Sequence, residues 1–214
     1  MLNTLNQPQS SALSDKLLHF TKDFETYIQD LKNILQKPKS GDISFVDFDE
    51  TLYSRIPQFK KDKRFVECRG QAGIDLVYKE IGRDIFLKDY YNPDGVVKDV
   101  LSRTDVILTA GIDDLQRGKL EHSGIDKEAL VVAEHKQKPK AVLKYVLKSL
   151  KSIPENITFI DDKAFDLSEE FRLLSDILQT KIILENIYLD SEKPTEVDHI
   201  DKKIFEKGKE LVLS

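Results

Sequence analysis

The stretch ISFVDFDET, at residues 43–51, constrains the fold of this chain more than any other. A short apolar run that ends in polar residues is typical of a buried strand. Asp47 and Asp49 follow its carboxyl end, where open α/β sheets place their ligands. Two such carboxylates repel each other and lose hydration, so they need a counter-charge, and Mg²⁺ takes oxygen ligands of this kind. The stretch predicts a strand that ends in metal-binding acids, although an acidic loop capping a helix is an alternative for these residues alone.

Length and composition favour one soluble domain. The chain has 214 residues, 40% of them hydrophobic and 33% charged, with a net charge of −5, which argues against general attraction to nucleic acid. The single cysteine, Cys68, excludes an internal disulfide and suits a reducing compartment. We see neither a signal peptide nor an apolar run long enough for a membrane span. We therefore expect a cytoplasmic protein without a membrane partner, and the oligomeric state stays open.

The N-terminal region divides into two parts. Residues 1–14 are polar and are expected to be disordered. Residues 15–36 carry apolar side chains at steps of three and four, which predicts an amphipathic helix. Its apolar face is expected to pack on the core of a single domain at 15–214, and a dimer interface is the alternative.

Strand and helix patterns alternate along the rest of the chain. Strands are expected at 43–47, 105–109, 130–133, 157–160 and 181–184, the last one running as far as 189, and helices at 113–122, 139–151 and 164–174. An insertion at 53–104 has helical patterns at 71–81 and 94–101, and the charged tail at 198–213 is expected to be partly helical. This alternation predicts an α/β fold with a mostly parallel, five-stranded sheet covered by helices on both faces.

Polar groups follow three of these strands. Asp47 ends the first strand and Asp49 follows it, Thr109 ends the second, and the fourth runs into Asp161 and Asp162. Lys138 opens the helix before the fourth strand. Because the carboxyl ends of parallel strands meet at one sheet edge, these groups are expected to converge. A nucleophilic carboxylate, a metal-binding acid pair, a hydroxyl and a fixed cation are the parts that phosphoryl transfer requires.

These four pieces, in this order, resemble the motifs of the haloacid dehalogenase superfamily of phosphatases and phosphotransferases. Residues 47–51 resemble its first motif, 106–109 its second, Lys138 its third and 160–162 its fourth. The resemblance covers about residues 43–187 and implies a three-layer, Rossmann-like sheet with the first strand at its centre. It also implies that the 53–104 insertion is a small helical cap over the site.

The resemblance implies a role for each residue. Asp47 would attack phosphorus and form an aspartyl-phosphate. Asp49 would protonate the leaving oxygen and then activate water, and its backbone carbonyl would bind Mg²⁺. Thr109, with the amide of Ala110, would hold the phosphoryl oxygens, and Lys138 would neutralise the charge of Asp47 and the phosphate.

Two assignments have alternatives. Asp162 is expected to bind Mg²⁺ directly beside Asp47, with Asp161 acting behind it or through water, and the reverse assignment is possible. Lys138 is favoured as the motif lysine because it precedes the first core-facing position of its helix, and Lys140 is the alternative. Glu50 stands where many members of the superfamily carry glycine, at a variable position.

The expected function is Mg²⁺-dependent hydrolysis of a small phosphorylated metabolite. Family relatives that cleave carbon–halogen bonds lack the second acid of the first motif, so Asp49 favours phosphate chemistry. The alternatives are a phosphatase acting on nucleic-acid ends or phosphoproteins, and a non-catalytic binding or regulatory protein of the same fold. Lysines recur at positions 136, 140, 144 and 148, and a solvated face is the simplest interpretation. A track for an anionic polymer such as nucleic acid is the alternative, and the absence of interleaved aromatic residues apart from Tyr145 argues against base stacking.

Overall fold

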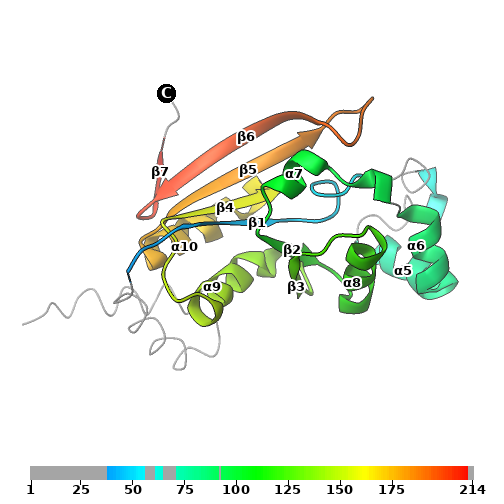
Figure 1. Cartoon of the computed structure of the whole chain (residues 1–214), viewed down its shortest axis with the longest axis horizontal. Coiled ribbons are helices and arrows are strands. Elements are labelled where there is room, and N and C mark those ends of the chain that lie inside the picture. The colour runs from blue at the N-terminus through cyan, green and yellow to red at the C-terminus, as the bar shows by residue number, and fades with distance from the viewer. Residues whose placement is uncertain (1–37, 56–60, 65–70, 92, 212–214) are drawn as a thin grey trace, which may run out of the picture.

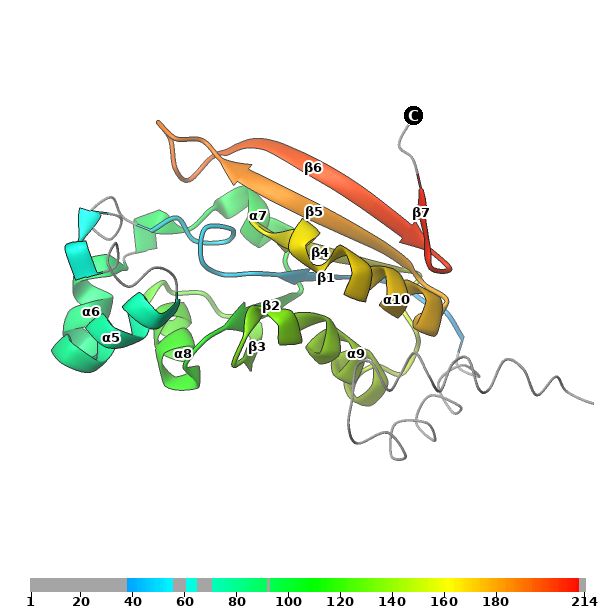
Figure 2. The same ribbon diagram turned by 180° about the vertical axis from the view of Figure 1, so that it is seen from behind.

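A computed structural model describes residues 38–55, 61–64, 71–91 and 93–211. Its centre is a mixed sheet of seven strands in the order β3-β2-β1-β4-β5-β6-β7 (Figures 1 and 2). The strands are β1 (Asp42–Val46), β2 (Val106–Ala110), β3 (Glu128–Val132), β4 (Asn156–Asp161), β5 (Lys181–Leu189), β6 (Val197–Glu206) and β7 (Lys209–Leu211). The expected Rossmann-like α/β class is confirmed, but the expected strand number, five, is wrong.

The parallel part of the sheet is β3-β2-β1-β4-β5, with β1 at its centre. Successive side chains of β1 point to opposite faces: Phe45 joins the buried cluster that includes α9 (Lys138–Ser149) and α10 (Ser168–Leu178), and Val46 joins the cluster that includes α8 (Asp113–His122). A strand buried on both faces is mostly apolar, which is why residues 43–46 predict it well. The exception is Ser44, whose backbone amide and hydroxyl donate to the carboxylate of Asp105 at 2.8 and 2.9 Å. Helices on both faces make three layers (Figures 1 and 2).

Most of the helices lie where the sequence predicts them. The α-helices are α5 (Gln71–Ile81), α6 (Arg83–Tyr90), α7 (Lys98–Ser102), α8 (Asp113–His122), α9 (Lys138–Ser149) and α10 (Ser168–Leu178), with 3₁₀ turns η1 (Pro93–Gly95), η2 (His135–Gln137) and η3 (Ala164–Leu167). Three details differ from expectation. The 94–101 helix is split into η1 and α7, the 164–174 helix begins as η3 and continues to Leu178, and α6 was not predicted.

The C-terminal tail is a correction: the partly helical segment expected at 198–213 is, in its described part up to residue 211, made of strands β6 and β7, which form an antiparallel meander with β5. Apolar residues of β6 recur at spacings that suit a helix, but its partner strand decides its structure. Lys202 stands opposite Glu185 of β5 and pairs with it at 2.7 Å, and Phe205 is buried. Lys207 and Gly208 both have positive φ, at 50° and 75°, which suits the two-residue turn of the β6–β7 hairpin.

The insertion between β1 and β2 packs beside α8, and its helices α5 and α6 lie beyond the carboxyl ends of the parallel strands (Figures 1 and 2). Side chains of α5, α6 and α7 share one buried cluster with α8 and with Val46 and Ile107 of the sheet. Phe48, Tyr53 and Tyr91 stack at centroid distances of 5.0–6.3 Å and join the insertion to the loop after β1. The predictions for residues 1–14 and 15–36 lie outside the described residues. In the described ranges, no helix has the length and apolarity that a membrane crossing requires.

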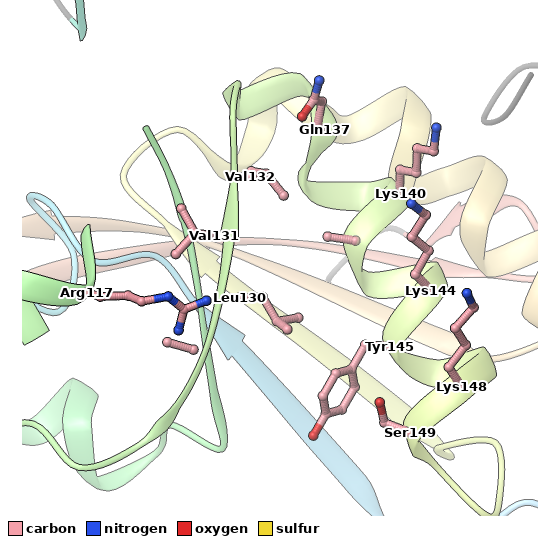
Figure 3. Close-up of a pocket in the computed structure, with 12 residues that line it drawn as sticks. Arg117, Leu130, Val131, Val132, Gln137, Lys140, Lys144, Tyr145, Lys148 and Ser149 are labelled. Carbon is pink, nitrogen blue, oxygen red and sulfur yellow. The ribbon is translucent and has the colours of Figure 1, made fainter. Parts of the chain in front are cut away.

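Strand β3 forms one edge of the sheet and borders a groove of about 530 Å³. Lys140, Lys144 and Lys148 extend from α9 on one side of this groove, and Arg117 of α8 lies on the other (Figure 3). This groove is separate from the cavity at the carboxyl ends of the parallel strands.

Candidate functional site

A tight loop after β1 sets the positions of Asp47 and Asp49. The amide of Asp47 donates to the carbonyl of Ile160 at 2.9 Å, which continues the β1–β4 pairing by one residue. The chain then turns back, since the Phe48 carbonyl accepts from the amides of Leu52 and Tyr53 at 3.0 and 2.8 Å.

The turn needs a left-handed residue, and Glu50 supplies it at φ 61°. A left-handed backbone costs a non-glycine residue a small conformational energy, because its Cβ approaches the following carbonyl oxygen. Glu50 also accepts a hydrogen bond from Arg55 at 2.8 Å, which directs that guanidinium toward the site.

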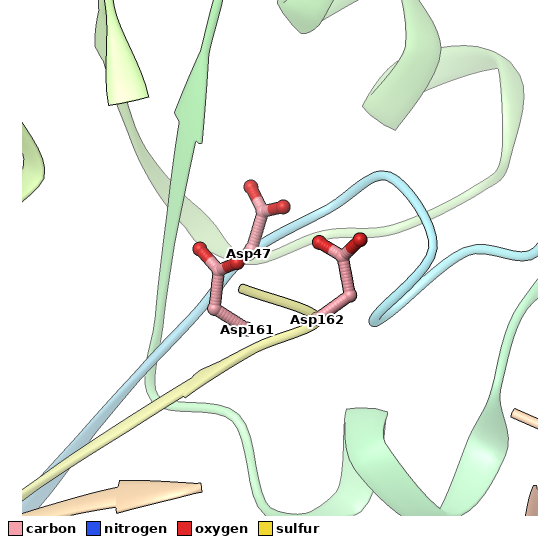
Figure 4. Close-up of side chains that lie close together, drawn as sticks. All are labelled: Asp47, Asp161 and Asp162. Carbon is pink, nitrogen blue, oxygen red and sulfur yellow. The ribbon is translucent and has the colours of Figure 1, made fainter. Parts of the chain in front are cut away.

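Three carboxylates converge at this end of the sheet. One oxygen of each of Asp47, Asp161 and Asp162 lies within 4.8 Å of the others. Figure 4 shows the three side chains gathered at the ends of β1 and β4. Residues 47 and 161–162 are far apart in the sequence, and the parallel pairing of β1 with β4 brings them together.

Lys138 is the cation of this cluster. It opens α9, is 1% exposed, and lies 2.8 Å from Asp47 Oδ1 and 2.6 Å from Asp161 Oδ2. Burial opposes its charge, but the two carboxylates outweigh burial and raise its pKa. Lys140 instead lines the groove beside β3, so the structure brings Lys138, and not the alternative, into contact with Asp47.

One ammonium does not balance three carboxylates. Burial, reinforced by Asp161, raises the pKa of Asp47 to about 7 although Lys138 opposes this. Burial and Asp161 likewise raise the pKa of Asp162 to about 6. Excess negative charge among oxygen ligands is the setting that a hard divalent cation fits. The residues present therefore fit the expected Mg²⁺.

Asp161 and Asp162 differ in the contacts of their oxygens. Asp161 accepts from Lys138 with one oxygen and from the backbone amide of Lys163 with the other, at 2.6 and 2.8 Å. Asp162 is half-buried, and among the described residues its nearest cation is the exposed Lys163, with an N–O distance of 3.8 Å. The backbone amide of Asp162 donates to the hydroxyl of Thr51 at 2.9 Å, which ties the β4 end to the loop after β1.

Thr109 is buried at the end of β2, and Gln116 of α8 forms hydrogen bonds with Thr109 and with its neighbour Ala110. The threonine hydroxyl donates to the side-chain oxygen of Gln116 at 3.2 Å, and the Gln116 nitrogen donates to the carbonyl of Ala110 at 2.8 Å. Both Thr109 and Ala110 line the same cavity as Asp47, with a volume of about 410 Å³.

Asp49 lines this cavity but does not belong to the three-carboxylate cluster. Its two oxygens accept from Lys119 at 2.7 Å and from the Tyr91 hydroxyl at 2.9 Å. Burial disfavours its charge, but Lys119 and Arg55 outweigh burial and lower its pKa. Lys119 is fully buried, and burial lowers its pKa despite Asp49. Asp49 is therefore held as a carboxylate.

Three residues around Asp49 were missed by the sequence reasoning. Lys119 stands one helical turn after the buried Leu115 of α8, so a lysine on an apolar helix face was a usable signal. Tyr91 and Arg55 belong to the insertion between β1 and β2, and no local pattern marks them. Arg55 and Ile74 complete the cavity wall on that side.

A scan against protein-family models found no match, and searches of curated proteins and of solved structures found none either.

Proposed function

We propose that this protein is a member of the haloacid dehalogenase superfamily that hydrolyses a phosphomonoester with Mg²⁺ through an aspartyl-phosphate. One observation carries the proposal: the carboxylate of Asp47, at the end of the central parallel strand, lies 2.8 Å from the buried ammonium of Lys138 and within 4.8 Å of two further carboxylates. A carboxylate nucleophile, a fixed cation and a cation-binding acid pair are what a phosphoryl-transfer site needs.

The magnesium ligands would be the side chains of Asp47 and Asp162, with the backbone carbonyl of Asp49. Asp161 is less suited because Lys138 and the Lys163 amide already occupy its two oxygens. A bound Mg²⁺ would neutralise the charge that the carboxylates and the phosphate bring together.

The residues divide the two chemical steps between them. Asp47 attacks phosphorus, the ester P–O bond breaks, and the electron pair leaves with the alcohol oxygen, which takes up a proton. Water then attacks the phosphorus of the aspartyl-phosphate and regenerates Asp47 and inorganic phosphate. The amide of Ala110 and Lys138 hold the phosphoryl oxygens in both steps. The hydroxyl of Thr109 joins them by turning its proton from Gln116 to the phosphate.

Asp49 is the acid–base group, and its environment favours one of its two tasks. As a carboxylate it accepts the proton of the attacking water in the second step. Its lowered pKa makes the protonated form, which assists the leaving alcohol, a minor species at neutral pH. An aryl phosphate, whose leaving group departs without a proton, is therefore the better probe of the first step.

The cavity suits a small substrate. Its volume of about 410 Å³ lies near the lower end of the usual range for small-molecule sites. Arg55, 20% exposed in its side chain, faces Asp49 from the insertion and offers a guanidinium to an anionic substrate. We infer that the insertion at 53–104 acts as the cap and selects a small phosphorylated metabolite.

Hydrolysis of p-nitrophenyl phosphate tests the proposed function, with and without EDTA. Asp162→Asn is expected to raise the Mg²⁺ concentration for half-maximal activity at least about tenfold, because one charged ligand is lost. Asp166→Asn, which changes an exposed acid a few residues away, is the matched control and is expected to leave it unchanged. EDTA-resistant turnover would contradict the proposal, and an unchanged Mg²⁺ requirement in Asp162→Asn would move the ligand role to Asp161.

Asp49 is expected to set one limb of the pH profile of kcat. Lys119→Met is expected to shift the midpoint of that limb to higher pH by at least about one pH unit. Loss of the ammonium removes the largest interaction that lowers the pKa of Asp49. The shift has the same direction in either role. A base in the slow step gives a limb that rises with pH and an acid gives one that falls, and each has its midpoint at the pKa of Asp49. The measurement is the pH profile of kcat, with Arg117→Met on the exposed side of α8 as control. An unshifted profile would exclude Asp49 from acid–base catalysis.

A further inference from the structure

The outer edge of β3 offers backbone groups for another strand. In the described chain, β3 pairs only with β2. The carbonyl of Val132 accepts from the amide of Gly111 at 2.8 Å, so the backbone groups of Val132 face β2. Since successive residues of a strand direct these groups to opposite sides, those of Ala129 and Val131 face outward. The next outward amide, of Ala133, donates to the side chain of Gln137 at 3.3 Å.

Basic side chains stand on both sides of this edge. The groove of about 530 Å³ is lined by Lys140, Lys144 and Lys148 of α9 and by Arg117 of α8 (Figure 3). Arg117 pairs with Asp113 at 3.0 Å, but this exposed pair within one helix is worth little. The β3 side chains in the groove, at positions 129–132, are half-buried aliphatic residues.

The spacing of the lysines matches an extended chain. Lys140, Lys144 and Lys148 lie on one helix face with a rise of about 6 Å between neighbours. Side chains on one face of a strand repeat every ~6.6–6.8 Å. We propose that β3 and α9 bind an extended acidic segment of a partner protein, which adds to the sheet as a strand beside β3. The main chain pairs with Ala129 and Val131, and alternate acidic side chains meet the lysines.

Other occupants fit the groove less well. Single-stranded nucleic acid needs aromatic faces on which bases stack. Tyr145, the aromatic residue of the groove, packs edge-on against Phe45 at 5.5 Å and donates its hydroxyl to Glu128 at 2.7 Å. A second copy paired edge to edge would bring the lysines of two α9 helices together, which like-charge repulsion opposes.

The groove ends beside the candidate site. Gln137 lines the groove and its neighbour Lys138 lines the cavity of Asp47. A bound segment would thus have one end next to the carboxylates, although its binding does not depend on chemistry there.

Fluorescence anisotropy of the full chain tests the proposal, with a labelled ten-residue peptide of alternating Glu and Val. A peptide of the same composition with all Glu before all Val has equal charge but no strand register, and we expect it to bind at least tenfold more weakly. Changing Lys140, Lys144 and Lys148 together to Glu is expected to abolish binding of the alternating peptide.

Val131→Pro removes an outward N–H without touching the β2–β3 hydrogen bonds and is expected to weaken binding at least tenfold. Val131→Thr keeps that N–H and is expected to bind as the wild type does. Thermal melting checks folding, and should Val131→Pro fail to fold, the block peptide and the lysine variant still decide the question.

Four results would overturn the proposal. These are absence of binding, equal binding of the two peptides, tighter binding of a ten-residue oligothymidylate, and sedimentation as a dimer whose formation competes with the peptide. The third result would assign the groove to nucleic acid, and the fourth would assign it to a second copy of the chain.

Discussion

Replacing Asp47 by Asn is expected to reduce kcat for p-nitrophenyl phosphate by at least about 10³-fold, because an amide cannot serve as the nucleophile in this reaction. Asp47 is 8% exposed. Asparagine has nearly the same size and shape as aspartate, because an amino group replaces one carboxylate oxygen. The site geometry is therefore expected to survive. The substitution also removes a carboxyl group whose pKa is raised by burial to about 7 and which is therefore unfavourable in its charged form. The variant is accordingly not expected to be less stable than the wild type at pH 8.

The control for this prediction lies at the other end of the same strand. Asp42 opens β1, is exposed, and accepts a hydrogen bond from Asn156 at 2.7 Å. Asp42→Asn removes a carboxylate from β1 without approaching the cavity and is expected to keep wild-type turnover. Both variants are assayed at saturating Mg²⁺ and compared by thermal melting. Turnover by Asp47→Asn within tenfold of the wild type would show that the nucleophile is another group.

The parallel core could be predicted because its local sequence and its tertiary environment agree. Strands buried on both faces are short apolar runs, and α8 and α9 have the helical period, so β1, β2, β4 and these helices lie within a few residues of their predicted positions. The convergence of Asp47, Lys138, Asp161 and Asp162 follows from topology alone, since parallel strands end on one side of the sheet.

Strand β6 and the surroundings of Asp49 could not be predicted, because both depend on contacts between residues that are distant in the sequence. Strand β6 is polar and half-exposed, and its conformation is set by pairing with β5 through contacts such as Lys202–Glu185. The environment of Asp49 depends on how the insertion packs, because Tyr91 of the insertion bonds to Asp49 and packs against Phe48 and Tyr53. Local periodicity carries no information about either arrangement.

Lys138→Met is expected to lower the free energy of unfolding at pH 8 by ~3–5 kcal/mol, because it leaves buried carboxylates without their cation. Lys138 is the shared partner of Asp47 and Asp161, and Asp161 is fully buried. Methionine keeps most of the volume of the lysine stem, so the loss reports charge and not a cavity. Lys140→Met on the same helix removes a lysine from the groove wall and is expected to change stability by less than about 0.5 kcal/mol.

The pH dependence of that loss separates electrostatics from packing. The folded-state pKa of Asp47 is already raised to about 7, above its ordinary 3.8. The folded protein therefore holds a proton that the unfolded chain releases in this interval, so this group costs stability as pH rises from about 4 to 7. Without Lys138 the pKa of Asp47 rises further and the cost in stability increases.

Urea titrations of metal-free protein should accordingly show a smaller difference in the free energy of unfolding between Lys138→Met and wild type at pH 5 than at pH 8. At pH 8, Mg²⁺ should restore part of the loss, because a cation bound only by the folded state stabilises it. A loss that is equal at both pH values would mean that Lys138 contributes through packing, and the charge balance proposed for this site would be wrong.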